Sequence, residues 1–102
     1  MKRQLLLLLW ITLIATVARA QVTIRGAVKS SRGESLPGVN VMIRGSFDGA
    51  TTDHNGEFGF STLKTGEQTL LLSFLGFKTK EVHLYLANDT ILETLYMKDN
   101  AG

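Results

Sequence analysis

Cysteine is absent from this sequence of 102 residues, and proline occurs only once. Without cysteine the chain can form no disulfide, no thiolate zinc site and no cysteine nucleophile. There is also no internal repeat and no low-complexity linker. The length allows one domain and leaves no room for a second.

Surplus positive charge is confined to the first twenty residues. The whole chain carries 11 basic and 9 acidic side chains, a net charge of +2. Lys2, Arg3 and Arg19 account for three of the basic residues, so the remaining 82 residues have a net charge of −1. This balance argues against a nucleic-acid partner, which requires a basic surface.

Long apolar runs are also missing, apart from one near the start. Residues 5–17 form a run of 13 residues, shorter than the ~20 that a membrane-spanning helix needs. Met1-Lys2-Arg3 precede the run and Ala18-Arg19-Ala20 follow it. This layout predicts a signal peptide over residues 1–20, cleaved after Ala20; an N-terminal membrane anchor is the alternative. No cysteine follows the cleavage point, which argues against a lipoprotein.

Beyond residue 20, apolar residues alternate with polar ones in short stretches, and no helical period occurs. This pattern predicts about seven β-strands separated by turns, hence an all-β fold, a small antiparallel β-sandwich. The near-continuous apolar run at 69–75 favours a strand buried on both faces. The domain is expected over residues 21–98, followed by a polar tail at 99–102. The expected strands cover residues 22–28, 39–43, 51–52, 58–60, 69–75, 82–86 and 91–97.

The apolar positions of these strands define the expected core. A domain this small buries only ~60–65% of its unfolded surface, so its stability should be modest. The core residues we expect are Val22, Ile24, Val28, Val39, Val41, Ile43, Phe58, Phe60, Leu70, Leu72, Phe74, Val82, Leu84, Leu86, Ile91 and Leu95.

Turn residues punctuate the strands and are interpreted as scaffold. Proline presets φ and glycine permits positive φ, so Pro37-Gly38 predicts a turn into the second strand. Asn-Gly is a strong hairpin signal, so the segment 53–56 is expected to form a hairpin turn. The scaffold turn positions are Pro37, Gly38, Gly45, Gly49, Asn55, Gly56 and Gly76.

No set of residues in the sequence supports catalysis or metal binding. His54 and Glu57 have a spacing that two zinc ligands can share, but the other histidine, His83, is expected on the polar face of another strand. An EF-hand starting at Asp53 would need a glutamate where Lys64 stands. Serine elbows and phosphate-binding glycine loops are missing. We therefore expect no enzyme, no catalytic or metal site, no cofactor and no small-molecule substrate.

Two aromatic residues are candidate partner contacts. Phe47 lies in the glycine-bracketed segment 45–49, where an aromatic ring has little core to join. Tyr85 shares a strand face with polar residues. A carbohydrate-binding platform is the alternative role for Tyr85, although no tryptophan follows residue 20. Asn88-Asp89-Thr90 matches short glycosylation patterns, but an ordinary turn is the simpler interpretation.

Several blocks of the sequence follow one another in a distinctive order: IRGAV (24–28), LPGVNV (36–41), GS (45–46), GATTD (49–53), NGEF (55–58) and SFLGF (73–77). Together these blocks resemble the carboxypeptidase-regulatory-like (transthyretin-like, immunoglobulin-like sandwich) domain. The nearest version is the one at the N-terminus of starch-utilisation-type TonB-dependent outer-membrane transporters. The resemblance covers about residues 22–98, with the blocks in the family's order.

The resemblance implies a non-catalytic accessory domain in the periplasm or at the outer membrane of a Gram-negative bacterium. Its partners would be proteins, namely its own plug and barrel or an outer-membrane transporter complex for glycan or peptide uptake. The segment 96–102 ends where the family would continue toward a TonB box, which favours a transporter fragment. The alternative is a stand-alone secreted β-sandwich that binds carbohydrate or protein.

Overall fold

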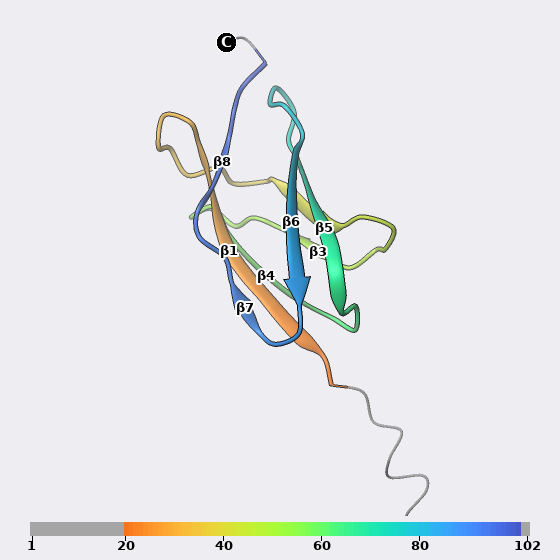
Figure 1. The fold of residues 1–102 in the computed structure, drawn as a ribbon. Helices are drawn as coiled ribbons and strands as arrows, with labels where there is room; N and C mark the ends of the chain where they lie inside the picture. Colours follow the sequence, from red (N-terminus) through yellow and green to blue (C-terminus); the bar gives the residue numbers. More distant parts are fainter. Residues whose placement is uncertain (1–19, 101–102) are drawn as a thin grey trace, which may run out of the picture.

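The computed structural model describes residues 20–100, which form eight β-strands and no helix (Figure 1). The predicted signal peptide falls almost entirely outside the described residues, as does the end of the predicted tail. None of the described segments is a helix with the length and apolar character needed to cross a membrane. The strands are β1 (Val22–Ser30), β2 (Asn40–Ile43), β3 (Gly49–Thr51), β4 (Glu57–Thr62), β5 (Gly66–Ser73), β6 (Lys80–Leu86), β7 (Thr90–Ile91) and β8 (Leu95–Met97).

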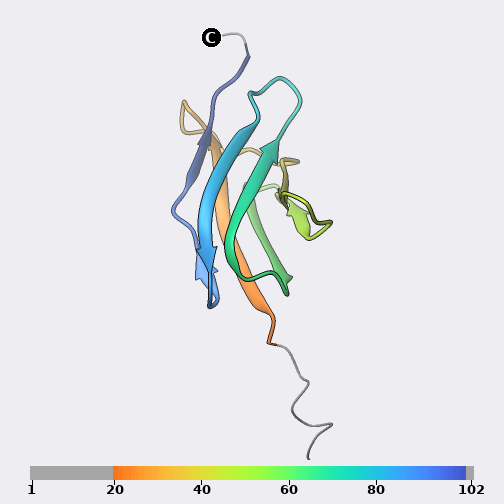
Figure 2. The same cartoon turned by 45° about the vertical axis from the view of Figure 1, so that its right-hand side comes forward.

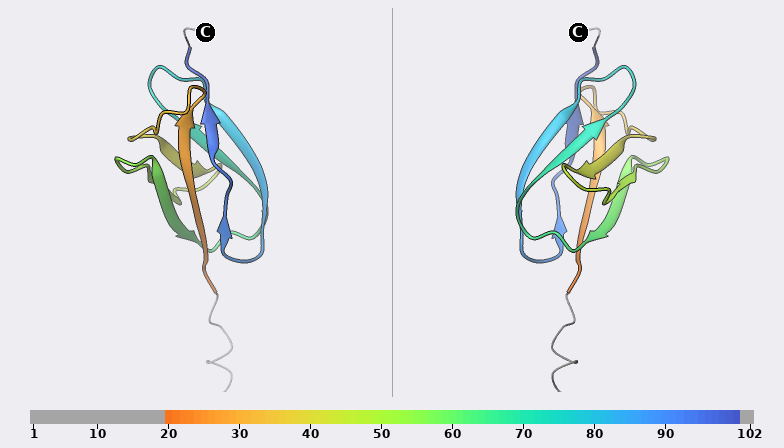
Figure 3. Two further views of the ribbon diagram at one scale, coloured as in Figure 1. Left: turned by 90° about the vertical axis from the view of Figure 1, so that its left-hand side faces the viewer. Right: turned by 90° about the vertical axis from the view of Figure 1, so that its right-hand side faces the viewer.

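The strands pack as two layers, which confirms the predicted β-sandwich (Figure 2). The first sheet has the order β4-β1-β7, and β8 also pairs with β1 further along that strand. The second sheet has the order β3-β2-β5-β6. On one side of the sandwich β3 lies against β4, which closes that side. The described chain enters at one end of the sandwich and leaves at the other (Figure 3).

The last predicted strand, 91–97, is in fact two strands, and both run parallel to β1. Ile24 pairs with Thr90, and Val28 pairs with Leu95. Between these pairs the last segment takes five residue steps where β1 takes four, so one extra residue bulges out. Because successive side chains of a strand point to opposite faces, one extra residue reverses which of the following side chains face the core. The sandwich therefore contains two parallel strand pairs, whereas the sequence predicted an antiparallel sandwich.

This register makes Ile91 the one clear error in the predicted core. Ile91 pairs with Arg25, whose side chain faces outward, and Ile91 is 84% exposed. Leu92 packs against the core instead, and Met97 is buried. No local pattern distinguishes Ile91 from Leu92, because the pairing with β1 decides which of them faces inward.

The rest of the core follows the prediction closely. Ten predicted residues are buried, and Leu36 joins them from the segment before β2. Five others, at the margins of the sheets, are half-buried: Phe60, Phe74, Val82, Leu84 and Leu95. β5 is not buried on both faces as expected, since Leu70 and Leu72 are buried while Leu71 is only half-buried. Beyond the end of β5, Leu75 is exposed.

The turn at 53–57 is longer than the hairpin turn expected over residues 53–56. The backbone N–H of Gly56 donates to the carbonyl of Asp53, and the N–H of Asp53 donates to the carbonyl of Glu57. Only Gly56 has a positive φ, of 76°, whereas Asn55 does not. The loop therefore contains three residues, and it connects β3 of the second sheet to β4 of the first.

Candidate functional site

The Pro37-Gly38 turn is held by a buried threonine that the sequence analysis assigned only to a strand. Gly38 has a φ of 84°, as expected. The hydroxyl of Thr52 donates to the carbonyl of Leu36 at 2.6 Å and accepts from the N–H of Val39 at 2.9 Å. One side chain thus satisfies two backbone groups in the core. The preference of threonine for strands does not predict this role.

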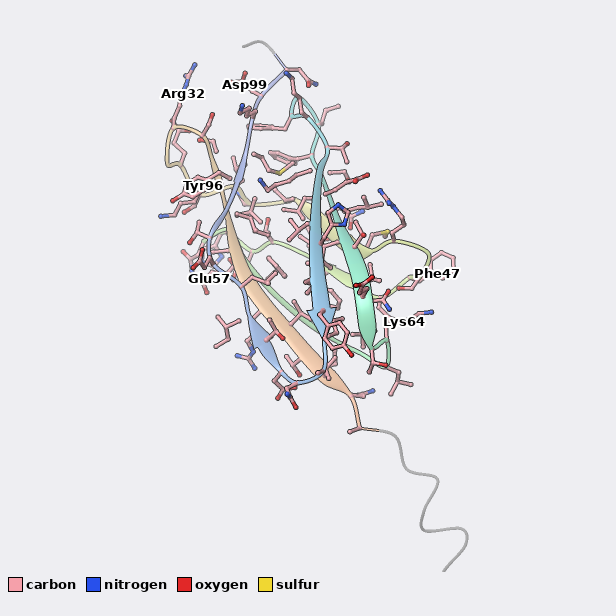
Figure 4. All side chains as sticks on the ribbon, viewed as in Figure 1. Arg32, Phe47, Glu57, Lys64, Tyr96 and Asp99 are labelled. Atoms are coloured by element: carbon pink, nitrogen blue, oxygen red, sulfur yellow. The ribbon has the colours of Figure 1, made fainter. Side chains whose placement is uncertain are left out.

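The segment between β2 and β3 presents Phe47 to solvent. Gly45 has a φ of 81°, and the N–H of Ile43 donates to the carbonyl of Asp48 at 3.0 Å, which closes the loop. The carboxylate of Asp48 accepts from the hydroxyl of Thr62 on β4 at 2.6 Å. Phe47 itself is fully exposed and projects away from the sandwich (Figure 4). The loop is therefore a fixed support for an exposed aromatic ring.

Tyr85 lies on the outer face of β6 and is 70% exposed. It pairs with Glu67 of β5, and the next pair on the same face of the two strands is His83 with Thr69. The Thr69 hydroxyl lies 3.0 Å from Nδ1 of His83. These four side chains, together with neighbouring backbone, line a shallow hollow in the outer face.

An ion pair borders this hollow. Arg44, just after β2, pairs with Glu81 of β6 across the intervening strand β5. Both side chains are about half exposed, so the pair contributes little stability, about 0–1 kcal/mol. It does neutralise the one acidic side chain on the outer face of β6.

Phe47 and Tyr85 do not form one site. Phe47 belongs to the loop that joins β2 and β3, and Tyr85 lies on β6 at the opposite margin of the second sheet. Four further large hydrophobic residues are exposed and were not predicted as contacts: Leu75 and Ile91 almost fully, Leu63 and Tyr96 by about half. Gly76, the last predicted turn, has a φ of 87° directly after Leu75. Leu75 is the last residue of the apolar run 69–75, which predicted a buried strand. It is exposed because the paired strand already ends at Ser73.

His54 lies in the exposed turn between β3 and β4, and Glu57 is the exposed first residue of β4. Among residues 20–100, no three histidine or acidic side chains gather as a metal site would require. Asp53 organises this turn, since its carboxylate accepts from the N–H groups of Glu57 and Asn55 at 3.0 and 2.9 Å. These hydrogen bonds, the one from Glu57 foremost, lower the pKa of the Asp53 carboxyl.

Another shallow hollow lies on the outer face of the first sheet. Gly59 of β4 stands opposite Arg25 of β1 and leaves a gap between larger side chains. Ile91 lines one side of the hollow and Glu57 the other. It combines apolar and charged groups without the enclosure of a ligand pocket.

Comparison with known proteins identifies the family of this sandwich. Residues 24–101 match the CarboxypepD_reg-like domain. The chain belongs to the CarboxypepD_reg-like domain family. The match begins within β1 and extends beyond β8, so it includes residues from all eight strands. It also confirms the resemblance drawn from the sequence blocks.

The curated relatives of this CarboxypepD_reg-like domain are TonB-dependent receptors. The receptor SusC of Bacteroides thetaiotaomicron is 34% identical over 73 residues, which cover 72% of this chain. The receptor P39 of Formosa agariphila is 33% identical over 78 residues, 76% of this chain. In both cases the chain spans 7% of the length of the relative.

Solved structures show the same sandwich at low sequence identity. A chain in a type II cohesin–X-dockerin complex from Acetivibrio cellulolyticus aligns with a TM-score of 0.69 and 22% identity, over 76% of this chain and 58% of that one. The 3-chlorocatechol 1,2-dioxygenase of Rhodococcus opacus aligns with a TM-score of 0.60 and 10% identity, over 80% of this chain and 61% of that one. These similarities concern the fold alone, because one sandwich serves many functions.

Proposed function

We propose that this CarboxypepD_reg-like domain is a non-catalytic accessory domain of a TonB-dependent receptor and acts through protein contacts. The observation that carries the proposal is its 33–34% identity to two receptors along most of the sandwich. Because the chain spans only 7% of each receptor, transport itself would belong to other parts of such a protein.

The predicted signal peptide extends this proposal to a location. Export would place the domain in the periplasm, on the inner side of the outer membrane of a Gram-negative bacterium. The absence of cysteine suits a domain that folds there without disulfides. Its partners would be the plug and barrel of its own receptor or another component of the transport complex, with glycans or peptides as the transported class.

Two exposed aromatic rings on firmly held elements support the role of protein contacts. Phe47 is fully exposed on a loop tied to β4, and Tyr85 is exposed on β6. Exposed aromatic residues are typical anchors of protein interfaces, since they bury a large area at a low cost in conformational entropy. Their separation on the second sheet favours two contact points over one compact pocket.

A chimera tests the receptor role. The segment of SusC that aligns with this chain would be deleted or replaced by this domain, and growth that depends on SusC would be measured. Deletion should impair growth while the receptor still reaches the outer membrane, and the replacement should restore it. A replacement that accumulates normally and yet behaves like the deletion would refute the proposal.

Substitution of Phe47 refines this test. In the chimera, Phe47→Ala should reduce the restored growth, because it removes an exposed ring without disturbing the core. Leu63→Ala is the matched control, since Leu63 is half exposed in another loop. Equal effects of the two substitutions would exclude Phe47 as a contact.

The alternative function, carbohydrate binding by a secreted sandwich, depends on Tyr85. The hollow beside Tyr85 offers a single aromatic ring with His83, Thr69 and Glu67 as polar groups. Calorimetry of the exported chain against a panel of glycans tests this function directly. Binding that Tyr85→Ala abolishes would favour it over the receptor role.

A further inference from the structure

β6 is the long free edge of the sandwich, and Figure 3 shows it at the margin of the molecule. The strand has seven residues, and among the described strands it pairs with β5 alone. Just before it, the N–H of Lys78 donates to the carbonyl of Lys98, so the free edge begins at Lys80. The other edges in residues 20–100 are short or covered: β3, β7 and β8 have two or three residues each, and β4 lies beside β3. A free edge presents unpaired N–H and C=O groups to any extended strand.

β6 lacks the features that usually protect such an edge. Seven consecutive residues pair with β5, so no bulge twists the strand away, and it contains no proline. Its only formal charges are Lys80 and Glu81 at its start, and Arg44 neutralises Glu81. Natural edge strands are commonly blunted by bulges, prolines or inward-pointing charges.

The apolar side of β6 is also incompletely covered. Val82 and Leu84 point toward the core and remain half-buried. Leu92 and Leu95 of the other sheet are half-buried as well. These residues lie on the side of the sandwich that β3 and β4 do not close, so a strand added to β6 would extend the core there.

We propose that the occupant of this edge is a second copy of the chain, with the two β6 strands paired antiparallel about His83. His83 is the midpoint of Lys80–Leu86, so this register pairs every residue of the strand. Val82 of each copy then stands opposite Leu84 of the other, an apolar pair. Glu81 of each copy stands opposite Tyr85 of the other, so that no two carboxylates face each other.

The proposed pairing joins the two second sheets into one continuous sheet of eight strands. Its contact extends over roughly 24 Å, the length of seven residues in a strand. The area falls below the ~1,200 Å² of standard interfaces, so the dimer belongs to the weak, transient class. This inference does not rest on the receptor role and can fail or succeed without it.

Single cysteines provide the decisive test, because the chain has no cysteine of its own. In exported protein under mild oxidation, His83→Cys should give a disulfide-linked dimer, since directly opposed residues have Cα atoms about 4.5–5.5 Å apart. Glu81→Cys and Tyr85→Cys should each stay monomeric alone and link to each other when mixed. Thr69→Cys, on the same outer face but on β5, is the matched control and should not link.

Sedimentation equilibrium of the cysteine-free protein measures the association directly. The mean mass should rise toward that of a dimer as the concentration approaches about 1 mM. His83→Lys should raise the dissociation constant several-fold, because it sets like charges directly opposite each other. Thr69→Lys should leave it unchanged.

Two outcomes would overturn the proposal. A protein that stays monomeric at about 1 mM, with no link formed by His83→Cys, would exclude a second copy and leave the edge to a strand of another protein. If Glu81→Cys alone links as well as His83→Cys alone, the stated register is excluded. Because His83 is exposed, both substitutions there should leave the fold intact, as circular dichroism would verify.

Discussion

Individual residues matter most in this domain where the backbone makes close turns. Of the predicted turn glycines, Gly38, Gly45, Gly56 and Gly76 have positive φ, which explains why the sequence requires glycine there. Gly49 has a different reason. A Cβ at residue 49 would overlap the Val41 carbonyl oxygen and stand 2.8 Å from Cα of Met42, because β2 and β3 approach closely there.

Gly49→Ala should therefore lower the free energy of unfolding by at least about 3 kcal/mol, since backbone atoms would have to move. Gly59→Ala is the control, because a Cβ at residue 59 would meet the flexible Arg25 side chain at 3.4 Å and the Ile24 carbonyl oxygen at 3.9 Å, both without overlap. It should change stability by about 0.5 kcal/mol or less. Urea unfolding followed by circular dichroism measures both. Equal losses would show that the close approach at Gly49 is not what requires glycine.

Thr52 provides a second prediction at this scale. Thr52→Val keeps the shape of the side chain but leaves the Val39 N–H and the Leu36 carbonyl without their buried partner. We expect a loss of about 1–3 kcal/mol in the free energy of unfolding. The neighbouring Thr51 is exposed, so Thr51→Val should have almost no effect. A tolerated Thr52→Val would mean that the hydroxyl bridge contributes nothing.

At the scale of elements, strand positions could be predicted from the sequence, but strand partners could not. Alternating apolar residues located β1, β2, β4 and β6, because a half-buried strand has a period of two, and the apolar run at 69–75 located β5. The pairing of β7 and β8 with β1 depends on contacts between residues far apart in the chain. For that reason Ile91 was assigned to the core, although it is exposed.

The turn between β3 and β4 leads to a prediction about pH. The folded state lowers the pKa of Asp53 from its unfolded value near 3.9. The resulting stabilisation is present above pH ~4 and is lost as the pH falls through the lower, folded-state pKa. Asp53→Asn keeps the oxygen acceptor but cannot titrate.

The wild type should therefore lose more of its thermal stability than Asp53→Asn when the pH falls from about 6 to about 2.5. Melting temperatures of both proteins across this range test the prediction. Other carboxylates titrate in both proteins and cancel in the comparison. Parallel melting curves for the two proteins would show that Asp53 does not stabilise the turn through its charge.

For the whole molecule, the sequence predicts removal of residues 1–20 on export. Mass spectrometry of the exported protein should find Gln21 at the N-terminus, because small residues at positions 18 and 20 suit signal peptidase. Ala20→Leu should block cleavage and leave the chain attached to the membrane. Gln21→Ser should still be cleaved. A protein that keeps residues 1–20 in the wild type would favour the membrane-anchor alternative.

Some candidate contacts can be predicted from neighbouring residues in the sequence, whereas others depend on which strands pair. Phe47 could be identified from the sequence, since its flanking glycines mark an exposed loop. The free edge of β6 could not, because a strand becomes an edge only when the order of the whole sheet is known. Likewise, the shallow hollow beside Tyr85 forms only when β5 and β6 pair.

The sequence by itself determined the class of fold, most of the core, four of the turn glycines and the family, whereas Gly49, predicted in a turn, begins β3. These depend on local alternation, on backbone conformations available to glycine and on short blocks of residues in a fixed order. Only the tertiary structure decided that β7 and β8 run parallel to β1, that Ile91 is exposed and Met97 buried, and that β6 is a free edge. These features depend on pairing across the whole chain, because one shifted residue in a strand exchanges its buried and exposed faces.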